Sequence, residues 1–348
     1  MRGGRAIVVA GAGAVGSAVA YALARGGWDV VVVDPSSTGG TASRVAAGML
    51  APAFEALFDE TSAEQFGLLT AARDRWPALA RAIGLPLSRD GAMAVGAPAD
   101  VDAWAARLGA LGARRQRLGP GEAAQLAPGI RSGAVFSPED WRLEPAAALT
   151  ALRSGAEALG ARFAVGRVAG FSGGRVALAG GEALVAGTLV IATGAAQSLA
   201  ELAPELAQLT PVKGHILRAA APWPSGPVLR GRDAYLCRTP GGLVLGATME
   251  PGLGDEAVDP SVVADLIARG ERLATGLAEL TWKASTGIRA ATPDGLPMVG
   301  ASVTPGVILA VGARRNGWLL APMIAETVVE LVQGAAQPAL FDPGRFRA

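Results

Sequence analysis

The sequence predicts an α/β fold in which a doubly wound, Rossmann-type domain is interrupted by pieces of a second domain with an antiparallel sheet. Three observations predict it. A strand, a glycine-rich turn, a helix and a second strand follow one another within residues 6–34, another buried strand comes much later at 188–192, and alternating strands fill 210–249. The βαβ order is typical of a parallel sheet, whereas the run of strands indicates a separate one.

Length and charge limit the classes of protein that this chain could be. Its 348 residues suit about two domains of roughly 100–200 residues each. Hydrophobic residues make up 51% and charged residues 18%, which excludes a disordered chain. The net charge of +1 provides no basic excess for nucleic acid or for an anionic membrane surface, so neither is an expected partner.

The single histidine and the single cysteine exclude several kinds of site. Cys237 has no second cysteine with which to form an intrachain disulfide or a thiolate cluster. His215 cannot form a multi-histidine centre by itself, so no metal site is predicted. A catalytic triad would require His215, but this residue lies in an apolar segment and no GxSxG motif is present. We expect both residues to be structural.

The uncharged run at 6–24 superficially resembles a membrane span or a signal peptide. Its three glycines and the strand pattern that follows favour a strand, a turn and a buried helix instead. We therefore expect no transmembrane segment and a cytoplasmic protein, and the sequence leaves open whether it forms a homo-oligomer.

The first motif has the order of a dinucleotide-binding unit. Residues 6–10 form an apolar strand, and Gly11, Gly13 and Gly16 follow it. In such a unit the first glycine permits a tight turn, the second lets the backbone approach a pyrophosphate, and the third lets helix and strand pack closely. Asp34 ends the next strand at about the spacing expected of an acid that binds a ribose hydroxyl. No arginine follows Asp34 directly, which disfavours NADP, but the unit itself does not distinguish FAD from NAD.

Periodicity predicts the remaining elements. Helices are expected at 62–83, 99–111, 145–159, 261–273 and 322–332. The third of these begins with Pro145, and proline is favoured at the first helical position. Strands are expected at 92–95, 134–137, 162–165, 176–178, 188–192, 212–218, 235–238, 243–247 and 307–311.

Eight segments, in order along nearly the whole chain, carry a family resemblance: 11–16, 46–50, 189–194, 211–214, 245–252, 287–289, 294–297 and 315–322. Together they resemble the FAD-dependent D-amino-acid oxidase superfamily, in particular its glycine oxidase branch associated with thiamine biosynthesis. The resemblance implies a discontinuous FAD-binding domain of the glutathione-reductase-like Rossmann type, made from residues 1–84, 142–208 and 284–348. It implies a substrate-binding α+β domain made from 85–141 and 209–283.

The resemblance also implies which residues contact FAD. The cofactor is expected to be non-covalent, because Cys237 does not match the position of the flavin-linked cysteine in some sarcosine oxidases. Asp34 stands where the family usually has a glutamate at the adenosine ribose. The implied contacts are Gly11, Gly13, Ala14, Val15, Gly16, Asp34, Pro35, Ala42, Ser43, Ala47, Gly48, Met49, Val168, Gly194, Arg314, Arg315, Asn316, Gly317, Trp318 and Leu319.

Three residues match the family's substrate site. Arg289 corresponds to the arginine that holds the substrate carboxylate, a role suited to a planar guanidinium that grips carboxylates bidentately. Tyr235 matches a pocket tyrosine, and Arg315 is similar to a second arginine near substrate and flavin. Because the flavin does the electronic work, the protein's task is to orient the substrate.

Several positions depart from the family pattern. Ala313 and Asp233 stand where relatives have histidine, and Ala195 and Ala196 replace an aromatic residue. We expect these positions near the pocket, so they leave the identity of the amino acid open.

The resulting functional hypothesis is the FAD-dependent oxidative deamination of a small amino acid. Glycine is the first candidate, with sarcosine and D-alanine as others. The product is an imine or oxo acid, which could serve thiazole synthesis, and O2 is reduced to H2O2. The alternatives are a D-amino-acid or sarcosine dehydrogenase that passes electrons to a quinone or carrier, an FAD-dependent tRNA-modification enzyme, and a flavoprotein retained for binding.

Overall fold

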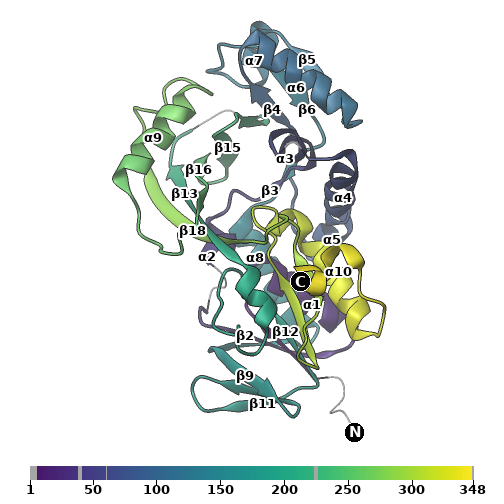
Figure 1. Cartoon of the computed structure of the whole chain (residues 1–348). Helices are drawn as coiled ribbons and strands as arrows, with labels where there is room; N and C mark the ends of the chain where they lie inside the picture. Colours follow the sequence, from purple (N-terminus) through teal and green to yellow (C-terminus); the bar gives the residue numbers. More distant parts are fainter. Residues whose placement is uncertain (1–5, 38–40, 60, 223–225, 347–348) are drawn as a thin grey trace.

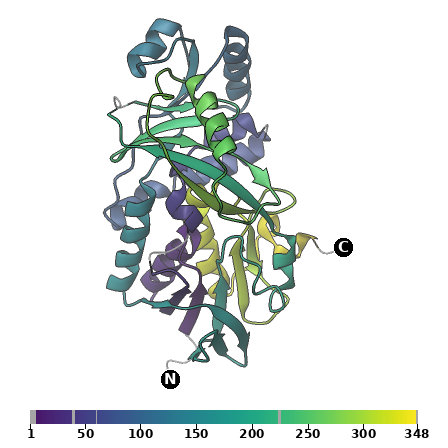
Figure 2. The same cartoon turned by 90° about the vertical axis from the view of Figure 1, so that its left-hand side faces the viewer.

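The computed structural model describes residues 6–37, 41–59, 61–222 and 226–346. Two large sheets lie one above the other, as the two views in Figures 1 and 2 show. The lower sheet has six strands and the upper sheet has nine. None of the helices in the described parts of the chain is both long and apolar enough to cross a membrane.

The six-stranded sheet is parallel except at one edge, where β19 runs antiparallel to β20. In spatial order its strands are β19 (Met298–Ala301), β20 (Val307–Val311), β12 (Thr188–Ile191), β1 (Ala6–Ala10), β2 (Asp29–Asp34) and β8 (Arg162–Val165). A small antiparallel sheet covers part of it and consists of β9 (Val168–Ser172), β10 (Arg175–Leu178) and β11 (Ala183–Val185).

The nine-stranded sheet is antiparallel apart from the β14–β4 pair. Its strands are β17 (Glu250–Pro251), β13 (Thr210–Ala219), β16 (Gly242–Gly246), β15 (Tyr235–Thr239), β14 (Val228–Arg230), β4 (Ala92–Val95), β6 (Ala134–Ser137) and β5 (Gln116–Leu118), with β18 (Lys283–Ala291) also paired to β13. A further short pair joins β3 (Met49–Leu50) to β7 (Trp141–Arg142).

Ten α-helices lie within the described residues. They are α1 (Ala14–Arg25), α2 (Thr41–Val45), α3 (Pro52–Phe58), α4 (Ala63–Arg73), α5 (Trp76–Ala82), α6 (Pro98–Ala110), α7 (Pro120–Leu126), α8 (Pro145–Ala158), α9 (Pro260–Glu271) and α10 (Gly317–Val332). Short 3-10 helices occupy Pro204–Gln208, Ala339–Phe341 and Pro343–Phe346.

Each large sheet is buried on both faces. In β1, Ile7 and Val9 join the core formed with α1, α8 and α10, while Val8 and Ala10 join the core on the opposite face. This burial on both sides explains why β1 is apolar throughout rather than alternating. In the upper sheet, the face that contains Ile216 packs against α3 and α6, and the opposite face packs against α9.

Two predicted helices differ from the structure because of prolines. The stretch 62–83 is divided into α4 and α5, and α5 has Pro77 in its first turn, where the missing N–H is tolerated. The last helix begins at Gly317 and contains Pro322. Pro322 cannot donate to the carbonyl of Trp318, and that oxygen instead accepts a hydrogen bond from the Trp76 indole at 3.0 Å. A tertiary contact thus satisfies the acceptor that the proline leaves open.

Strand β18 belongs to the upper sheet. It lies within residues 284–348, which were predicted to be part of the nucleotide-binding domain, and no strand was predicted at this place. All nine residues of β18 instead pair with β13 of the upper sheet, from Lys283 opposite Arg218 to Ala291 opposite Thr210. The chain therefore returns to the lower sheet after Ala291.

The glycine turn generates a prediction about stability. A Cβ added at Gly16 would lie 2.0 Å from the carbonyl oxygen of Gly11, with no flexible side chain to move aside. We expect Gly16→Ala to lower the free energy of unfolding by at least about 1–3 kcal/mol, the usual cost of overpacking, as measured by denaturant titration.

Gly67→Ala is the matched control for this prediction. Gly67 is also a helical glycine, but an added Cβ there meets nothing within 4 Å. Replacing it should stabilise the protein by up to about 1 kcal/mol. Equal effects of the two substitutions would contradict the packing argument.

Candidate functional site

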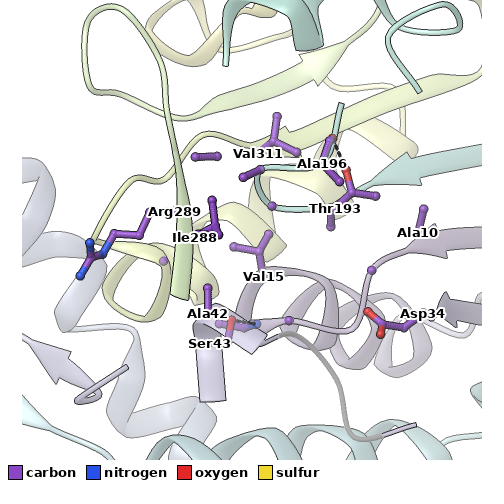
Figure 3. Close-up of a pocket in the computed structure, with 18 of the residues that line it drawn as sticks. Ala10, Val15, Asp34, Ala42, Ser43, Thr193, Ala196, Ile288, Arg289 and Val311 are labelled. Carbon is purple, nitrogen blue, oxygen red and sulfur yellow. Dashed lines mark hydrogen bonds between the residues drawn. The ribbon is translucent and has the colours of Figure 1, made fainter. Parts of the chain in front are cut away.

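A cavity of about 560 Å³ lies between the two large sheets. It is lined by the turn after β1, the end of β2, the start of α2, the ends of β12 and β20, and β18. Figure 3 shows Asp34 at one end and Arg289 at the other, with Val15 and Ala42 between them. The cavity is therefore elongated, and its two ends carry opposite charges.

The turn between β1 and α1 forms one wall of the cavity. Gly11 has φ +106°, and a Cβ there would lie 2.4 Å from the carbonyl oxygen of Ala192. Gly13 has an ordinary φ, and a Cβ there would meet only the Ser43 hydroxyl, at 3.1 Å, among the described residues. Packing within the chain therefore requires glycine at position 11 much more strongly than at position 13. A Cβ at Gly13 would instead project toward the cavity that this residue lines, so the surface here suits a bulky ligand that approaches the backbone.

Asp34 is held in one orientation at its end of the cavity. One carboxylate oxygen accepts the backbone N–H of Ala12 at 2.7 Å, and the other accepts that of Ser36 at 2.8 Å. A carboxylate has further lone pairs, so Asp34 can still accept a hydroxyl from a ligand. The geometry fits the ribose contact implied by the sequence.

Arg289 is a cation without an acidic partner. Its Nη1 donates to the carbonyl oxygen of Thr248 at 3.2 Å and lies 3.5 Å from the sulfur of Met249. Within the described parts of the chain, it forms no ion pair with a carboxylate, and burial lowers the pKa of its guanidinium below the usual value. Because a shielded cation is costly unless it is paired, this end of the cavity favours an anionic ligand.

Arg314 and Arg315 also line the cavity, but both are paired with acidic residues. The Nε of Arg315 donates to buried Glu55 of α3, and its Nη2 lies 2.8 Å from Asp59. Arg314 contacts the same Asp59 oxygen at 3.2 Å. Arg315 is therefore less available to a carboxylate ligand than Arg289, although both were predicted to lie at the substrate.

Glu55 connects the cavity to a second buried arginine. Its other oxygen accepts Nη2 of Arg230 at 2.9 Å. Burial by itself would raise the pKa of Glu55, but Arg315 and Arg230 outweigh that effect and hold the pKa below its ordinary value. Glu55 therefore stays ionised between two guanidinium groups.

Asp140 caps the N-terminus of the same helix, α3. Its two oxygens accept the backbone N–H groups of Ala53 at 2.8 Å and Phe54 at 3.2 Å. The residue is only 2% exposed, and this burial raises its pKa to about 7 despite the nearby charge of Arg230. Two carboxylates near the first turn of one short helix thus have pKa values shifted in opposite directions.

Tyr235 lies beside the cavity rather than in its wall. Its ring packs against the same core as Phe58 and Met49 do, and the guanidinium carbon of Arg230 lies 6.0 Å from the ring centroid. Burial raises the pKa of the Tyr235 hydroxyl above its usual value, so the phenol stays neutral. A neutral phenol near Arg289 can donate a hydrogen bond without cancelling the arginine's charge.

Most of the predicted cofactor contacts surround the cavity. Those that line it are Gly11, Gly13, Ala14, Val15, Asp34, Pro35, Ala42, Ser43, Val168, Gly194, Arg314, Arg315, Gly317 and Trp318. Those that do not line it are Gly16, Ala47, Gly48, Met49, Asn316 and Leu319.

Several of the residues outside the lining help to hold the cavity wall in place through packing and contacts behind it. Gly48 has φ +74°, and a Cβ there would lie 2.2 Å from the carbonyl oxygen of Leu143. The sulfur of Met49 is 3.0 Å from Nη1 of Arg230, and Asn316 caps α10.

Among the departures from the family pattern, Ala313, Ala195 and Ala196 line the cavity. Asp233 does not. It pairs with Arg272 at 2.8 Å on the surface beside α9, so its expected place near the pocket is wrong. A charged residue that follows a bend is better solvated there than against a buried sheet.

His215, Lys213 and Cys237 occupy structural positions. The His215 ring is fully buried, with Nδ1 2.9 Å from Glu250 and Nε2 accepting the backbone N–H of Asp259 at 3.0 Å. Lys213 pairs with Asp255 at 2.6 Å, so both side chains anchor the loop between β17 and α9. Burial raises the pKa of the Cys237 thiol to about 11, which leaves it unreactive.

Sequence reasoning missed several residues of the lining. Those after β12 could have been found, because ligands bind at the carboxyl ends of parallel strands. The lining residues that come from the upper sheet and from the loop after β17 are not marked by any local sequence pattern. The missed residues include Ser36, Arg167, Thr193, Ser198, Leu199, Pro211, Gly254, Glu256 and Ile288.

Comparison with known proteins identifies close relatives. A family model described as FAD dependent oxidoreductase (DAO) matches residues 6–331. A glycine oxidase of Geobacillus kaustophilus (strain HTA426) is 29% identical and aligns with 94% of this chain and 92% of its own. A crystal structure of glycine oxidase from Geobacillus kaustophilus has a TM-score of 0.86 at 27% identity, covering 98% of this chain and 99% of that one.

One relative is a fusion protein. A bifunctional ThiO/ThiG protein of Synechocystis sp. (strain ATCC 27184 / PCC 6803 / Kazusa) is 36% identical over 39% of this chain and 22% of its own length. The similarity therefore concerns a minor part of that longer protein.

Asp140 generates a prediction about pH. Its pKa in the folded protein is about 7, compared with an ordinary value of 3.8, so between these pH values the folded state binds more protons than the unfolded state. The free energy of unfolding contributed by this group should therefore fall as the pH rises from about 4 to about 7, by up to about 1.4 kcal/mol per pH unit.

Asp140→Asn mimics the protonated acid and should remove this contribution. Denaturant unfolding at several pH values measures it as the difference in slope between the two proteins. Asp102→Asn, which changes an exposed aspartate of α6, is the control and should leave the slope nearly unchanged. Parallel pH profiles for the original protein and Asp140→Asn would contradict the assignment.

Proposed function

The chain belongs to the FAD-dependent oxidoreductase (DAO) family and binds FAD, and from that premise we propose that it oxidises a small amino acid, glycine first. The single observation that carries the proposal is Arg289, an arginine without an acidic partner at the end of the cavity opposite Asp34. Among the arginines described at that end, it is the one without an ion pair to a carboxylate, so it offers a carboxylate ligand a counter-charge.

The cavity fits FAD on its own geometry. The Gly13 surface and the N-terminus of α1 suit the pyrophosphate, since both present backbone N–H groups and no bulky side chain. Asp34 is placed to accept ribose hydroxyls, and the loop before α10 would border the ring system. Bound FAD supplies the electron acceptor that protein side chains lack.

The protein's own contribution is to bind and orient the substrate. Arg289 would grip the carboxylate through two N–H groups, which fixes the rotation of a small amino acid as well as its position. Tyr235 would stay protonated and add one hydrogen-bond donor. We infer no catalytic base from Glu55, which is paired with arginine, or from Asp140, which caps a helix.

The similarity to glycine oxidases supports glycine as the first substrate to test. Oxidation of the amine gives an imine, which water converts to an oxo acid and ammonia. The similarity to a ThiO/ThiG protein supports a role in supplying that product to thiazole synthesis. The electron acceptor in the proposal is O2, which takes up two electrons and two protons to give H2O2.

A first prediction tests the cofactor site. Gly13→Val places a branched side chain on the surface that the pyrophosphate would cover, and it should lower the FAD content of the purified protein severalfold. Gly67→Val, at an open helical position, is the control for loss of a glycine. Full FAD content in Gly13→Val would place the cofactor elsewhere.

A second prediction tests the substrate site. Arg289→Ala should lower kcat/KM for the amino acid about 100-fold, the order expected for loss of a charge-assisted contact, while FAD remains bound. Anaerobic mixing with glycine, sarcosine and D-amino acids, followed by loss of the flavin absorbance, identifies the substrate before the variants are compared.

Arg175→Ala, at an exposed position of β10, is the control and should behave as the original protein does. Unchanged kinetics in Arg289→Ala would exclude Arg289 as the residue that binds the substrate carboxylate. Rapid flavin reduction with little H2O2 in air would favour a dehydrogenase over an oxidase.

A further inference from the structure

Three glycines of the upper sheet lie close together on the face toward the proposed substrate site. Gly287 of β18 is paired with Gly214 of β13, and Ile216, two residues further along β13, is paired with Gly246 of β16. Directly paired residues and residues two apart share one face of a sheet. The three glycines therefore lie on the same face, the one that packs toward α3 and the cavity.

The guanidinium of Arg289 lies in the space that Gly214 leaves open. A Cβ built on Gly214 would be 2.2 Å from Nη1, 2.5 Å from Nη2 and 2.7 Å from Cζ of Arg289. All three distances are shorter than any real carbon contact, so the head group covers this residue. The carbonyl of Thr248 then holds Nη1 from one side at 3.2 Å.

The phenol of Tyr235 likewise lies in the space that Gly246 leaves open. A Cβ on Gly246 would be 2.4 Å from the phenol oxygen and 2.5 Å from Cζ of Tyr235. Tyr235 and Gly246 are directly paired across β15 and β16, so the ring lies along the sheet rather than standing away from it. Gly287 completes the patch, because a Cβ there would lie 3.1 Å from Cα of Ala42 in α2.

The need for glycine at these places does not come from the backbone. Gly214 and Gly246 both lack a φ in the left-handed region, so alanine could adopt their conformations. An alanine methyl group at either position would, however, displace the neighbouring head group. The requirement is therefore specific to the side chains that the glycines receive.

We propose that Gly214 and Gly246 are positioning residues of the substrate site, which act by letting the heads of Arg289 and Tyr235 lie against the sheet. This rests on the proposed function in so far as Arg289 holds a carboxylate. Gly214 determines how close the guanidinium of Arg289 lies to the sheet, and Gly246 determines how close the phenol of Tyr235 lies to it. A methyl group at either position lifts the corresponding head toward the substrate and narrows the space left for it.

The test is a double-mutant cycle on the FAD-loaded protein. Gly214→Ala should weaken binding of acetate, a simple carboxylate probe titrated through the absorbance of the oxidised flavin, by about tenfold or more, because small displacements of a binding group are costly. In the Arg289→Ala background, which has no head group over Gly214, the same substitution should have little further effect on acetate binding.

Substrate kinetics and a strand control complete the experiment. Gly214→Ala should raise KM more than it lowers kcat, with FAD content unchanged. Gly170→Ala, in β9, adds a methyl group where nothing lies within 4 Å and should alter neither acetate binding nor KM. Gly246→Ala tests the second position, with Tyr235→Ala as the background that should remove its effect.

The outcomes separate this inference from the proposed function. If the original protein binds no carboxylate, the proposed function fails, and the cycle is then measured in Tm. Gly214→Ala should lower the Tm when Arg289 is present and not in Arg289→Ala. A variant that folds only in the Arg289→Ala background would support the inference. Equal effects of Gly214→Ala in both backgrounds, in binding and in Tm, would overturn it.

Discussion

The structure depends on a close approach of two backbone segments at the carboxyl ends of β1 and β12. Gly11 donates to the carbonyl of Val33 at 2.8 Å and lies so near Ala192 that no side chain could separate them. Three parallel strands therefore end at the same level, and the turn, Asp34 and the segment after Ala192 border one cavity. A ligand that lies across strand ends requires this alignment.

Charge distribution then distinguishes the two ends of that cavity. Arg314 and Arg315 form ion pairs with Asp59 and Glu55, which come from α3 and the residue that follows it. Within the described residues Arg289 forms no such ion pair, and its Nη1 contacts the carbonyl oxygen of Thr248 and the sulfur of Met249. Several arginines therefore lie near one another, but Arg289 is the one left available to bind an anionic ligand. The short helix α3 is essential to this arrangement, because it carries Glu55 between Arg315 and Arg230 and is itself capped by Asp140.

The upper sheet contributes shape rather than charge. Its face toward the cavity lacks side chains at Gly287, Gly214 and Gly246, so α2 and the heads of Arg289 and Tyr235 can lie close to it. Strand β18 is central because it pairs fully with β13 and also carries Ile288 and Arg289 to the cavity wall. Glycine thus has different roles in the two sheets. At the lower sheet it lets two backbone segments approach each other, and in the upper sheet it leaves space for the head groups of neighbouring side chains.

The sequence by itself determined the β1–α1–β2 unit, the places of more than half of the described strands and the two-sheet α/β fold, because these follow from local periodicity and from glycines at fixed spacing. The ordered motifs also indicated the FAD family and Arg289. Only the tertiary structure decided that β18 belongs to the upper sheet, that Arg315 is neutralised whereas Arg289 is not, and that Asp233 lies on the surface. These facts depend on contacts between residues far apart in the chain. Glu55 lies 260 residues from Arg315, and no local pattern records that one will neutralise the other.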